Sequence, residues 1–184
     1  MKFCSKCGNK VVLRVPAGDN RERFVCEHCD TIYYQNPRII TGCLTIWEDQ
    51  VLLCKRSINP RSGFWTLPAG FLENGETAQA GAARETWEEA CARVTIDELY
   101  TVFSLPHISQ IYLFYKAQLI DGSFSAGPET EQVALFREED VPWANLAFPV
   151  VGDTLRHYFR DRIDNRFTVH TGDIIVSKDR RPLR

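Results

Sequence analysis

Residues 70–92 read GFLENGETAQAGAARETWEEACA, and this stretch decides both the fold and the candidate active site. From Thr77 to about Ala92 most residues are strong helix formers. Thr77 is a suitable N-cap because its hydroxyl can accept a hydrogen bond from the first turn. Four charged residues then stand close together: Arg84, Glu85, Glu88 and Glu89. The stretch predicts a helix that concentrates negative charge.

The three glutamates fall on one side of this helix, within roughly 100° of arc at about 100° per residue. The side predicted to pack consists of small or apolar residues: Ala80, Ala83, Trp87, Ala90 and Cys91. Glu85 and Glu89 are a like-charge pair of the kind that costs about 0.2–0.5 kcal/mol on an isolated helix. The acidic side is therefore either a solvated surface or a site for a divalent cation, which prefers oxygen ligands and bridges to phosphates.

The spacing of these residues resembles the Nudix box, which reads Gly, five residues, Glu, seven residues, Arg-Glu, a bulky aliphatic residue, any residue, Glu-Glu, any residue, Gly and an aliphatic residue. Six of its seven invariant positions match: Gly70, Glu76, Arg84, Glu85, Glu88 and Glu89. Thr86 replaces the bulky aliphatic residue, and Cys91 replaces the closing Gly, whose usual role is a left-handed turn that ends the helix. We expect the geometry after the helix, rather than metal binding, to differ from the common pattern.

The resemblance implies an α/β (α+β) fold, the Nudix α/β/α sandwich with a mixed sheet between helices. It assigns ligation of Mg²⁺ or Mn²⁺ to three residues: Glu85, Glu88 and Glu89. It further implies that Gly70 contributes backbone and that Arg84 pairs with Glu76. Glu129 or Glu131, in a loop before a strand, is a candidate for the catalytic base. The implied reaction is hydrolysis of a nucleoside diphosphate linked to another group, in which cations neutralise the diphosphate and a carboxylate deprotonates the attacking water.

Two cysteine pairs precede this region. Cys4 and Cys7 form one C-x2-C pair, and Cys26 and Cys29 form another, with 18 residues between the pairs. The N-terminus lacks the apolar core of a signal peptide, and no stretch approaches the roughly 18 apolar residues that span a bilayer. We therefore expect a cytoplasmic protein with reduced thiols, whose four paired cysteines hold structural Zn²⁺ in a ribbon with too few apolar residues to fold alone. Four free thiols are the alternative.

Composition limits the classes of partner. The chain has 184 residues, 44% of them hydrophobic, and a formal net charge of −2. One sizeable core is expected, and no broad electrostatic field favours nucleic acid or a membrane. We expect a small-molecule dinucleotide as the partner, and the resemblance to zinc-ribbon proteins suggests a homodimer.

A zinc ribbon ahead of a Nudix domain narrows the resemblance to groups such as NADH pyrophosphatase and the plant chloroplast FAD pyrophosphatase. After the box, NADH pyrophosphatases carry a Ser-Gln-Pro-Trp-Pro-Phe-Pro signature, whereas residues 103–115 here read FSLPHISQIYLFY. The resemblance therefore implies hydrolysis of FAD to FMN and AMP, with ADP-ribose or NADH as alternative substrates. A regulator that binds nucleotide or nucleic acid without turnover is a further alternative. Trp65 and Phe71 are candidates for stacking on the substrate, and core packing is the other interpretation of both.

The rest of the sequence predicts strands and one more helix. The predicted strands are residues 38–47 and 51–56, which form a hairpin, and residues 93–105, 110–120 and 132–136. Residues 148–162 predict an amphipathic helix with Leu155, Tyr158 and Phe159 on its apolar side. The expected domains are a zinc ribbon at 1–35, a Nudix hydrolase domain at 36–165 and a C-terminal tail at 166–184. The last nine residues, VSKDRRPLR, are expected to be frayed or solvated.

Overall fold

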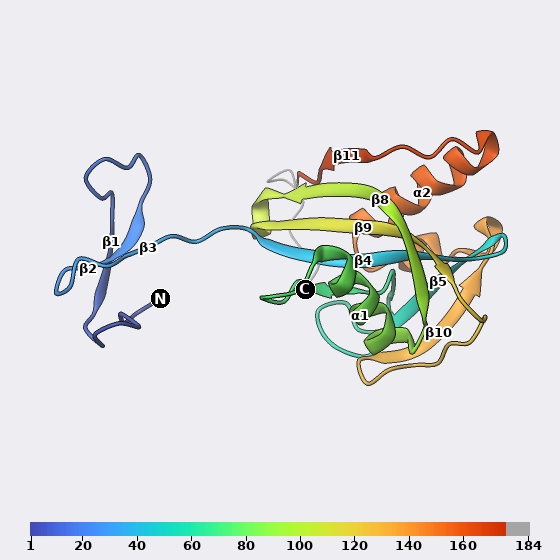
Figure 1. Ribbon diagram of the computed structural model, residues 1–184, viewed down its shortest axis with the longest axis horizontal. Coiled ribbons are helices and arrows are strands. Elements are labelled where there is room, and N and C mark those ends of the chain that lie inside the picture. The colour runs from blue at the N-terminus through green and yellow to red at the C-terminus, as the bar shows by residue number, and fades with distance from the viewer. Residues whose placement is uncertain (176–184) are drawn as a thin grey trace. The chain divides into compact units, whose positions relative to one another are not determined.

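The computed structural model describes residues 1–175, and the chain divides into two compact units (Figure 1). The first unit comprises Met1–Pro37, and the second begins at Arg38. Nearly all buried hydrophobic residues belong to the second unit. Among the described helices, none is both long enough and apolar enough to cross a lipid bilayer.

Three short antiparallel strands form the first unit: β1 (Val11–Arg14), β2 (Arg23–Cys26) and β3 (Ile32–Tyr33). Its buried hydrophobic residues are Cys4, Val25 and Cys26. Such a small interior buries too little apolar surface to offset the conformational entropy lost on folding. A further constraint, such as a bound metal, is needed to stabilise this unit.

A mixed sheet forms the centre of the second unit, with its main strands in the order β10, β5, β4, β9, β8, β11. The strands are β4 (Arg38–Trp47), β5 (Gln50–Arg56), β6 (Trp65–Thr66), β7 (Ala69–Phe71), β8 (Val94–Leu105), β9 (Gln110–Leu119), β10 (Thr130–Phe136) and β11 (His170–Asp173). β4 pairs with β9 in parallel, as does β8 with β11, whereas the other pairs are antiparallel. β6 adds to β5, and β7 adds to β4. The predicted hairpin and the later predicted strands are all present.

One helix covers each face of this sheet (Figure 1). The helices are α1 (Ala78–Ala90) and α2 (Pro149–Asp164), with short 3₁₀ turns at Pro106–Ile108, Glu138–Asp140 and Trp143–Asn145. Thr41 of β4 faces α1, because its hydroxyl donates to the carbonyl oxygen of Ala78 at 2.8 Å. Leu44 of β4 faces the other way and packs in one cluster with Leu155 and Phe159 of α2. The expected α/β/α sandwich with a mixed sheet is confirmed.

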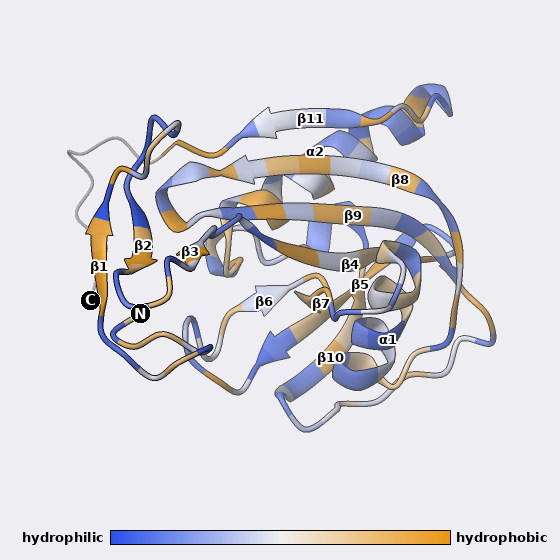
Figure 2. Cartoon of the chain, turned by 60° about the vertical axis from the view of Figure 1, so that its left-hand side comes forward, coloured by the Kyte–Doolittle hydropathy of each residue, from blue (hydrophilic) through white to orange (hydrophobic). Residues whose placement is uncertain are grey.

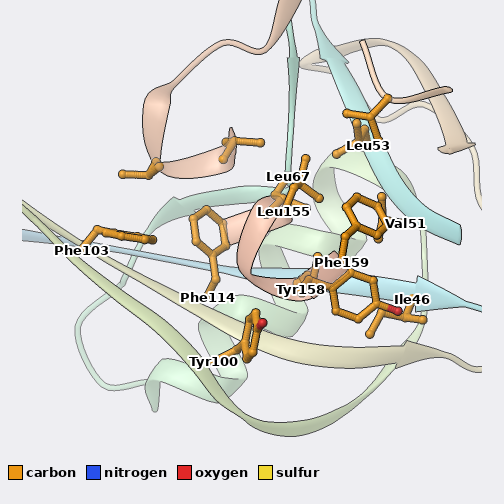
Figure 3. Packing of buried hydrophobic residues seen from close by; sticks show 14 of the residues in the cluster. Ile46, Val51, Leu53, Leu67, Tyr100, Phe103, Phe114, Leu155, Tyr158 and Phe159 are labelled. Carbon is orange, nitrogen blue, oxygen red and sulfur yellow. The ribbon is translucent and has the colours of Figure 1, made fainter. Parts of the chain in front are cut away.

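The larger hydrophobic core lies between the sheet and α2 (Figure 3). Leu155, Tyr158 and Phe159 are all buried in it, as the periodicity of residues 148–162 predicted. Hydrophobic and hydrophilic residues alternate along β8 and β9 (Figure 2), which is typical of strands whose two faces meet different surroundings. This core fixes the sheet on which the candidate site is built.

The packing face of α1 differs from the predicted one. The buried residues of this helix are Gly81, Ala82, Thr86, Glu89 and Ala90, whereas Trp87 is 48% exposed. Close approach to β4 selects small residues, since a Cβ on Gly81 would lie 2.9 Å from the Cγ2 atom of Thr41. Trp87 instead lies at the surface, with the guanidinium carbon of Arg93 5.6 Å from its ring centroid. The helix therefore turns one of its glutamates, not its tryptophan, toward the sheet.

The segment expected to be a tail also differs in part. His170–Asp173 forms β11, which pairs in parallel with β8 from Thr101 to Ser104. These residues have a weak strand signal of their own, so the pairing is a tertiary effect in which the edge of β8 supplies the hydrogen-bond partners. The predicted frayed stretch VSKDRRPLR lies outside the described residues.

Candidate active site

Both ends of α1 are defined by specific backbone interactions. At the start, Thr77 caps the helix by accepting a hydrogen bond from the N–H of Ala80 at 3.1 Å, as predicted. At the end, Cys91 adopts the left-handed conformation with φ of 47°, and its N–H donates to the carbonyl oxygen of Trp87 at 2.8 Å. The helix thus keeps the left-handed ending that a Gly usually provides, against our expectation of a different geometry. A residue with a Cβ holds this conformation at a cost of about 1 kcal/mol.

The loop before β10 closes the end of α1. The N–H groups of Ser125 and Gly127 donate to the carbonyl oxygens of Ala90 and Glu89 at 2.8 and 3.0 Å. These bonds satisfy carbonyls that a helix end leaves without partners. A Cβ on Gly127 would collide with the carbonyl oxygen of Glu88, so this close approach requires Gly. The sequence analysis did not single out Gly127, and no local motif marks it.

Strand β7 lies directly against the acidic residues of α1. A Cβ on Gly70 would overlap the carboxylate of Glu85, so the backbone at Gly70 borders this carboxylate directly. The N–H of the preceding residue, Ala69, donates to Oε2 of Glu89 at 3.2 Å. Two of the three glutamates therefore face the backbone of β7.

Arg84 connects four groups of the candidate site. Its Nε and Nη2 donate to the two carboxylate oxygens of Glu76 at 3.1 and 2.8 Å, which is the pair expected from the resemblance. Nη1 donates to Glu85 at 2.8 Å and to Glu88 at 3.1 Å. Nη2 also donates to the carbonyl oxygen of Phe71 at 3.1 Å. The bonds to Glu76 raise the pKa of Arg84 and lower the pKa of Glu76. Arg84 thereby fixes the loop before α1 and one side of the acidic row.

The three glutamates of the row have different surroundings. Glu89 is only 9% exposed, and burial raises its pKa to about 7, an effect opposed by the N–H of Ala69 and reinforced by the charge of Glu85. Burial also raises the pKa of Glu85, although Arg84 opposes this effect. The side chain of Glu88 is 54% exposed and contacts Arg84 at the surface. Glu85 and Glu89 are thus the enclosed pair, and Glu88 lies at the surface.

Glu129 lies in the loop before β10, whereas Glu131, which the sequence placed in the same loop, lies within the strand. The charge of Glu129 is among the smaller influences that raise the pKa of Glu89, after burial and the charge of Glu85. Glu131 instead forms an ion pair with Lys55, with 3.0 Å between Oε1 of Glu131 and Nζ of Lys55. Of these two candidates for the base, Glu131 is paired with Lys55, and Glu129 forms no such ion pair among residues 1–175.

The two aromatic candidates for substrate stacking also differ. Trp65 packs edge-to-face on Phe136 at a centroid distance of 4.9 Å and belongs to the border of the core. Phe71 is 45% exposed, and the guanidinium carbon of Arg38 lies 4.9 Å from its ring centroid. Phe71 therefore presents an accessible ring next to Gly70, whereas Trp65 mainly packs the core.

The donor set of the acidic row fits a hard cation, which prefers carboxylate and carbonyl oxygens. Glu85, Glu89 and the backbone at Gly70 form this set, and the absent side chain of Gly70 is what brings backbone against Glu85. Among residues 1–175, however, the carboxylates do not converge into a cluster of metal size. Glu85 and Glu88 are drawn toward Arg84 instead, which neutralises part of their charge.

The four paired cysteines do converge, with their sulfur atoms within 4.8 Å of one another. The Sγ atoms of Cys4 and Cys29 are 3.7 Å apart, and those of Cys7 and Cys26 are 3.5 Å apart. A tetrahedral Zn²⁺ with bonds of about 2.3 Å sets its sulfur ligands roughly 3.8 Å apart, so this geometry fits structural zinc. The hydroxyl of Tyr33 lies 2.9 Å from Sγ of Cys4, as an outer partner that orients the thiolate.

A mixed sheet between two helices, with this Gly-Glu-Arg-Glu-Glu-Glu constellation around α1, defines a protein of the Nudix class. The chain belongs to the NUDIX family: the family described as NUDIX domain matches residues 36–157, and the zinc-ribbon family described as Nudix N-terminal matches residues 2–35.

Individual relatives support this placement. The protein named NAD-capped RNA hydrolase NudC from Edwardsiella ictaluri is 28% identical over 165 residues, which cover 88% of this chain and 60% of the relative. The protein of the same name from Photobacterium profundum is 30% identical over 148 residues, which cover 79% of this chain and 50% of the relative. The chain thus spans half to three fifths of the length of these curated relatives. A crystal structure of a NUDIX hydrolase from Nitrosomonas europaea is 54% identical and superimposes with a TM-score of 0.92, covering 95% of this chain and 99% of that one.

Proposed function

We propose that this protein hydrolyses the diphosphate bond of a nucleoside diphosphate linked to another moiety, and that FAD, split into FMN and AMP, is its preferred substrate. The observation that carries the proposal is the enclosed carboxylate pair Glu85 and Glu89, set against the backbone of β7. A purely solvated acidic face would leave these side chains in water. Their enclosure supports a site in which a cation compensates their charge.

In this proposal Glu85, Glu88 and Glu89 hold Mg²⁺ or Mn²⁺ with the backbone of Gly70, and Arg84 positions Glu85 and Glu88. The bound cation would neutralise the diphosphate oxygens. Glu129 is the proposed base: it accepts a proton from the water that attacks phosphorus, and the bond between phosphorus and the bridging oxygen breaks. Glu76 holds Arg84 in place, and Phe71 offers its ring to the substrate. Trp65 acts mainly through packing.

The preference for FAD is supported by residues 103–115, which lack the proline-rich signature of NADH pyrophosphatases. ADP-ribose and NADH are the alternatives, since both contain the same adenosine diphosphate part. The curated relatives are named for NAD-capped RNA, so this substrate is tested beside them. A binding protein without turnover is a weaker candidate, because the box keeps every charged invariant residue and lacks only the closing Gly.

The wider proposal concerns the organisation of the protein. It comprises a zinc ribbon at 1–35 with structural Zn²⁺ and a catalytic domain at 36–165, in a homodimer. The reducing cytoplasm would keep the ribbon thiols available for zinc. Analytical ultracentrifugation tests the dimer, and a mass of about 21 kDa at micromolar concentration would contradict it.

The substrate is tested by measuring kcat/KM for FAD, NADH, ADP-ribose and NAD-capped RNA with Mg²⁺ or Mn²⁺. AMP and FMN are quantified by chromatography, and NAD-capped RNA is followed by release of nicotinamide mononucleotide. We expect the highest value for FAD, by about tenfold, which corresponds to roughly 1.4 kcal/mol of differential transition-state binding. A higher value for another substrate would move the preference to that compound. No product from any of the four at micromolar enzyme would defeat the proposed function.

A further inference from the structure

Each cysteine loop of the first unit is closed by its own backbone hydrogen bonds. In the first loop, the N–H of Cys4 donates to the carbonyl oxygen of Asn9 at 2.7 Å, and the N–H of Gly8 donates to the carbonyl oxygen of Cys4 at 2.9 Å. In the second loop, the N–H of Cys26 donates to the carbonyl oxygen of Thr31 at 2.9 Å. These bonds fix the backbone that carries each pair of sulfur atoms, but none of them joins one loop to the other.

The side chain of Tyr33 connects the two loops. Tyr33 lies in β3, directly after the second loop, and its hydroxyl reaches residues of the first loop that are 28 and 29 positions earlier in the chain. The N–H of Ser5 donates to this hydroxyl oxygen at 2.8 Å, and Sγ of Cys4 lies 2.9 Å from the same oxygen. The hydroxyl of Ser5 lies 3.2 Å from it. One oxygen atom therefore contacts both the backbone and a sulfur ligand of the opposite loop.

The direction of the bond between Tyr33 and Cys4 follows from the groups around it. A backbone N–H can only donate, so the Tyr33 oxygen is the acceptor of the bond from Ser5. The Ser5 hydroxyl has a proton of its own, whereas a thiolate that ligates Zn²⁺ has none and can only accept. The single proton of the Tyr33 hydroxyl is therefore directed at Sγ of Cys4.

This hydrogen bond meets an electrostatic need of a zinc site. Four thiolates bring more negative charge than one Zn²⁺ neutralises, and hydrogen-bond donors stabilise the excess charge. Cys4 is only 3% exposed, so donors from the protein must supply most of this stabilisation. Cys29 has a comparable partner in the hydroxyl of Thr31 at 3.1 Å, but Thr31 follows Cys29 within the same loop. Tyr33 differs because it stabilises a sulfur atom of the loop to which it does not belong.

We propose that Tyr33 is a positioning residue of the zinc site, whose hydroxyl stabilises the Cys4 thiolate and holds the two cysteine loops at the separation that Zn²⁺ requires. Its removal should weaken zinc binding, because outer partners of metal ligands typically contribute about 10- to 100-fold to metal affinity. The small interior of the first unit offers little compensation, since its buried hydrophobic residues are Cys4, Val25 and Cys26. This inference rests on the structural zinc proposed above and is independent of the substrate that the second unit hydrolyses.

The test compares the zinc affinity of the full-length wild type with that of Tyr33→Phe and Tyr34→Phe. Tyr33→Phe keeps the aromatic ring and removes only the hydroxyl. Tyr34 is the matched control, because it is the next residue, is 63% exposed, and contacts the guanidinium carbon of Arg23 through its ring at 5.1 Å, a contact that Phe retains. Competition with a chromophoric chelator gives the Kd for Zn²⁺. We expect this Kd to rise about 10- to 100-fold in Tyr33→Phe and to stay within twofold of the wild type in Tyr34→Phe.

A second measurement reports on the sulfur atoms directly. Protein loaded with Co²⁺ in place of Zn²⁺ has an absorption band for charge transfer from sulfur to metal, and a hydrogen bond to a thiolate lowers the energy of the sulfur electrons. This band should move to longer wavelength in Tyr33→Phe and stay in place in Tyr34→Phe. A role in folding alone would weaken metal binding without moving the band.

An unchanged Kd for Zn²⁺ or an unshifted cobalt band in Tyr33→Phe would overturn the role of Tyr33. Wild-type protein that binds no Zn²⁺ would overturn it together with the proposed zinc ribbon. The substrate panel measures the reaction of the second unit separately, so a failure of the proposed hydrolysis is recognised independently of the zinc measurements.

Discussion

Gly127 packs directly on the carbonyl oxygen of Glu88, across the end of α1. This contact ties the loop before β10 to the backbone that carries two residues of the acidic row. It is assisted by the hydrogen bond from the N–H of Gly127 to the carbonyl oxygen of Glu89 at 3.0 Å. The position of the glutamates therefore depends on a residue far from the Nudix box in sequence.

Replacing Gly127 with Ala should damage both stability and activity. The added Cβ would overlap the Glu88 oxygen and lie 2.9 Å from the Glu88 carbonyl carbon, and neither is a flexible side-chain end that moves freely. We expect a loss of about 1–3 kcal/mol in the free energy of unfolding, measured with urea, and a lower kcat. Ser125→Ala is the control, since Ser125 contributes to the loop through its N–H. Equal stability of Gly127→Ala and the wild type would contradict this prediction.

Replacing Glu89 with Gln should abolish turnover without destabilising the protein. The amide removes a charged ligand but keeps an oxygen that can accept the N–H of Ala69. Because a buried carboxylate is neutralised, the free energy of unfolding in the absence of metal should be unchanged or higher. We expect kcat to fall by at least about 100-fold. Glu131→Gln, which lies outside the site on Lys55, should retain activity, and near-normal turnover of Glu89→Gln would refute the metal assignment.

Removal of zinc should unfold the first unit and spare the second. The first unit buries few hydrophobic side chains, whereas the second has its own core. We expect one zinc per chain by atomic absorption. After treatment with a chelator, amide hydrogen exchange should accelerate across residues 1–37 while β4 and β9 stay protected. Cys26→Ser should lose the metal and Cys91→Ala should keep it, and freshly purified protein without zinc would rule out the ribbon assignment.

Replacing Cys91 with Gly should stabilise the protein. Cys91 holds φ of 47° at the end of α1, where Gly has no Cβ to strain. After the higher backbone entropy of Gly in the unfolded chain is included, a gain of up to about 0.5 kcal/mol is expected. Cys91→Ala retains the Cβ and should gain nothing. Urea unfolding of the two variants decides the matter, and equal midpoints would show that the left-handed ending carries no strain.

Because of Asp161, the free energy of unfolding of the second unit should fall at acid pH. It accepts hydrogen bonds from Nε2 of His170 at 2.6 Å and from the hydroxyl of Tyr100 at 3.0 Å. Burial alone would raise the pKa of Asp161, but these bonds outweigh burial and lower it below 3.8. Because the folded state holds the proton less tightly than the unfolded state, the stabilisation is complete above pH 3.8 and is lost as the pH falls through the folded-state value.

The measurement compares the wild type with Asp161→Asn from pH 3 to pH 7. The wild type should be more stable by on the order of 1 kcal/mol at neutral pH, and the difference should shrink toward pH 3. A difference that stays constant over this range would show that the charge of Asp161 contributes nothing.

The box was enough to predict the helix, its Thr77 cap and the pair of Arg84 with Glu76, because these features depend on spacing within about 20 residues. The packing face of α1 was not predictable in the same way. A hydrophobicity argument places Trp87 inside, but contact with β4 requires small side chains, and the residues that enclose Glu89 come from β7 and the loop before β10. Gly127 and the packing role of Trp65 likewise depend on contacts between segments distant in sequence.

β11 also affects how the catalytic unit can be shortened. A version of the protein that stops at Asn165 keeps every residue of the Nudix box yet removes the partner of β8 between Thr101 and Ser104. The exposed backbone of β8 would then offer unpaired N–H and C=O groups to neighbouring copies of the protein. Such trimmed protein is expected to aggregate, because β11, a short strand outside the matched family region, would no longer cover the edge of β8.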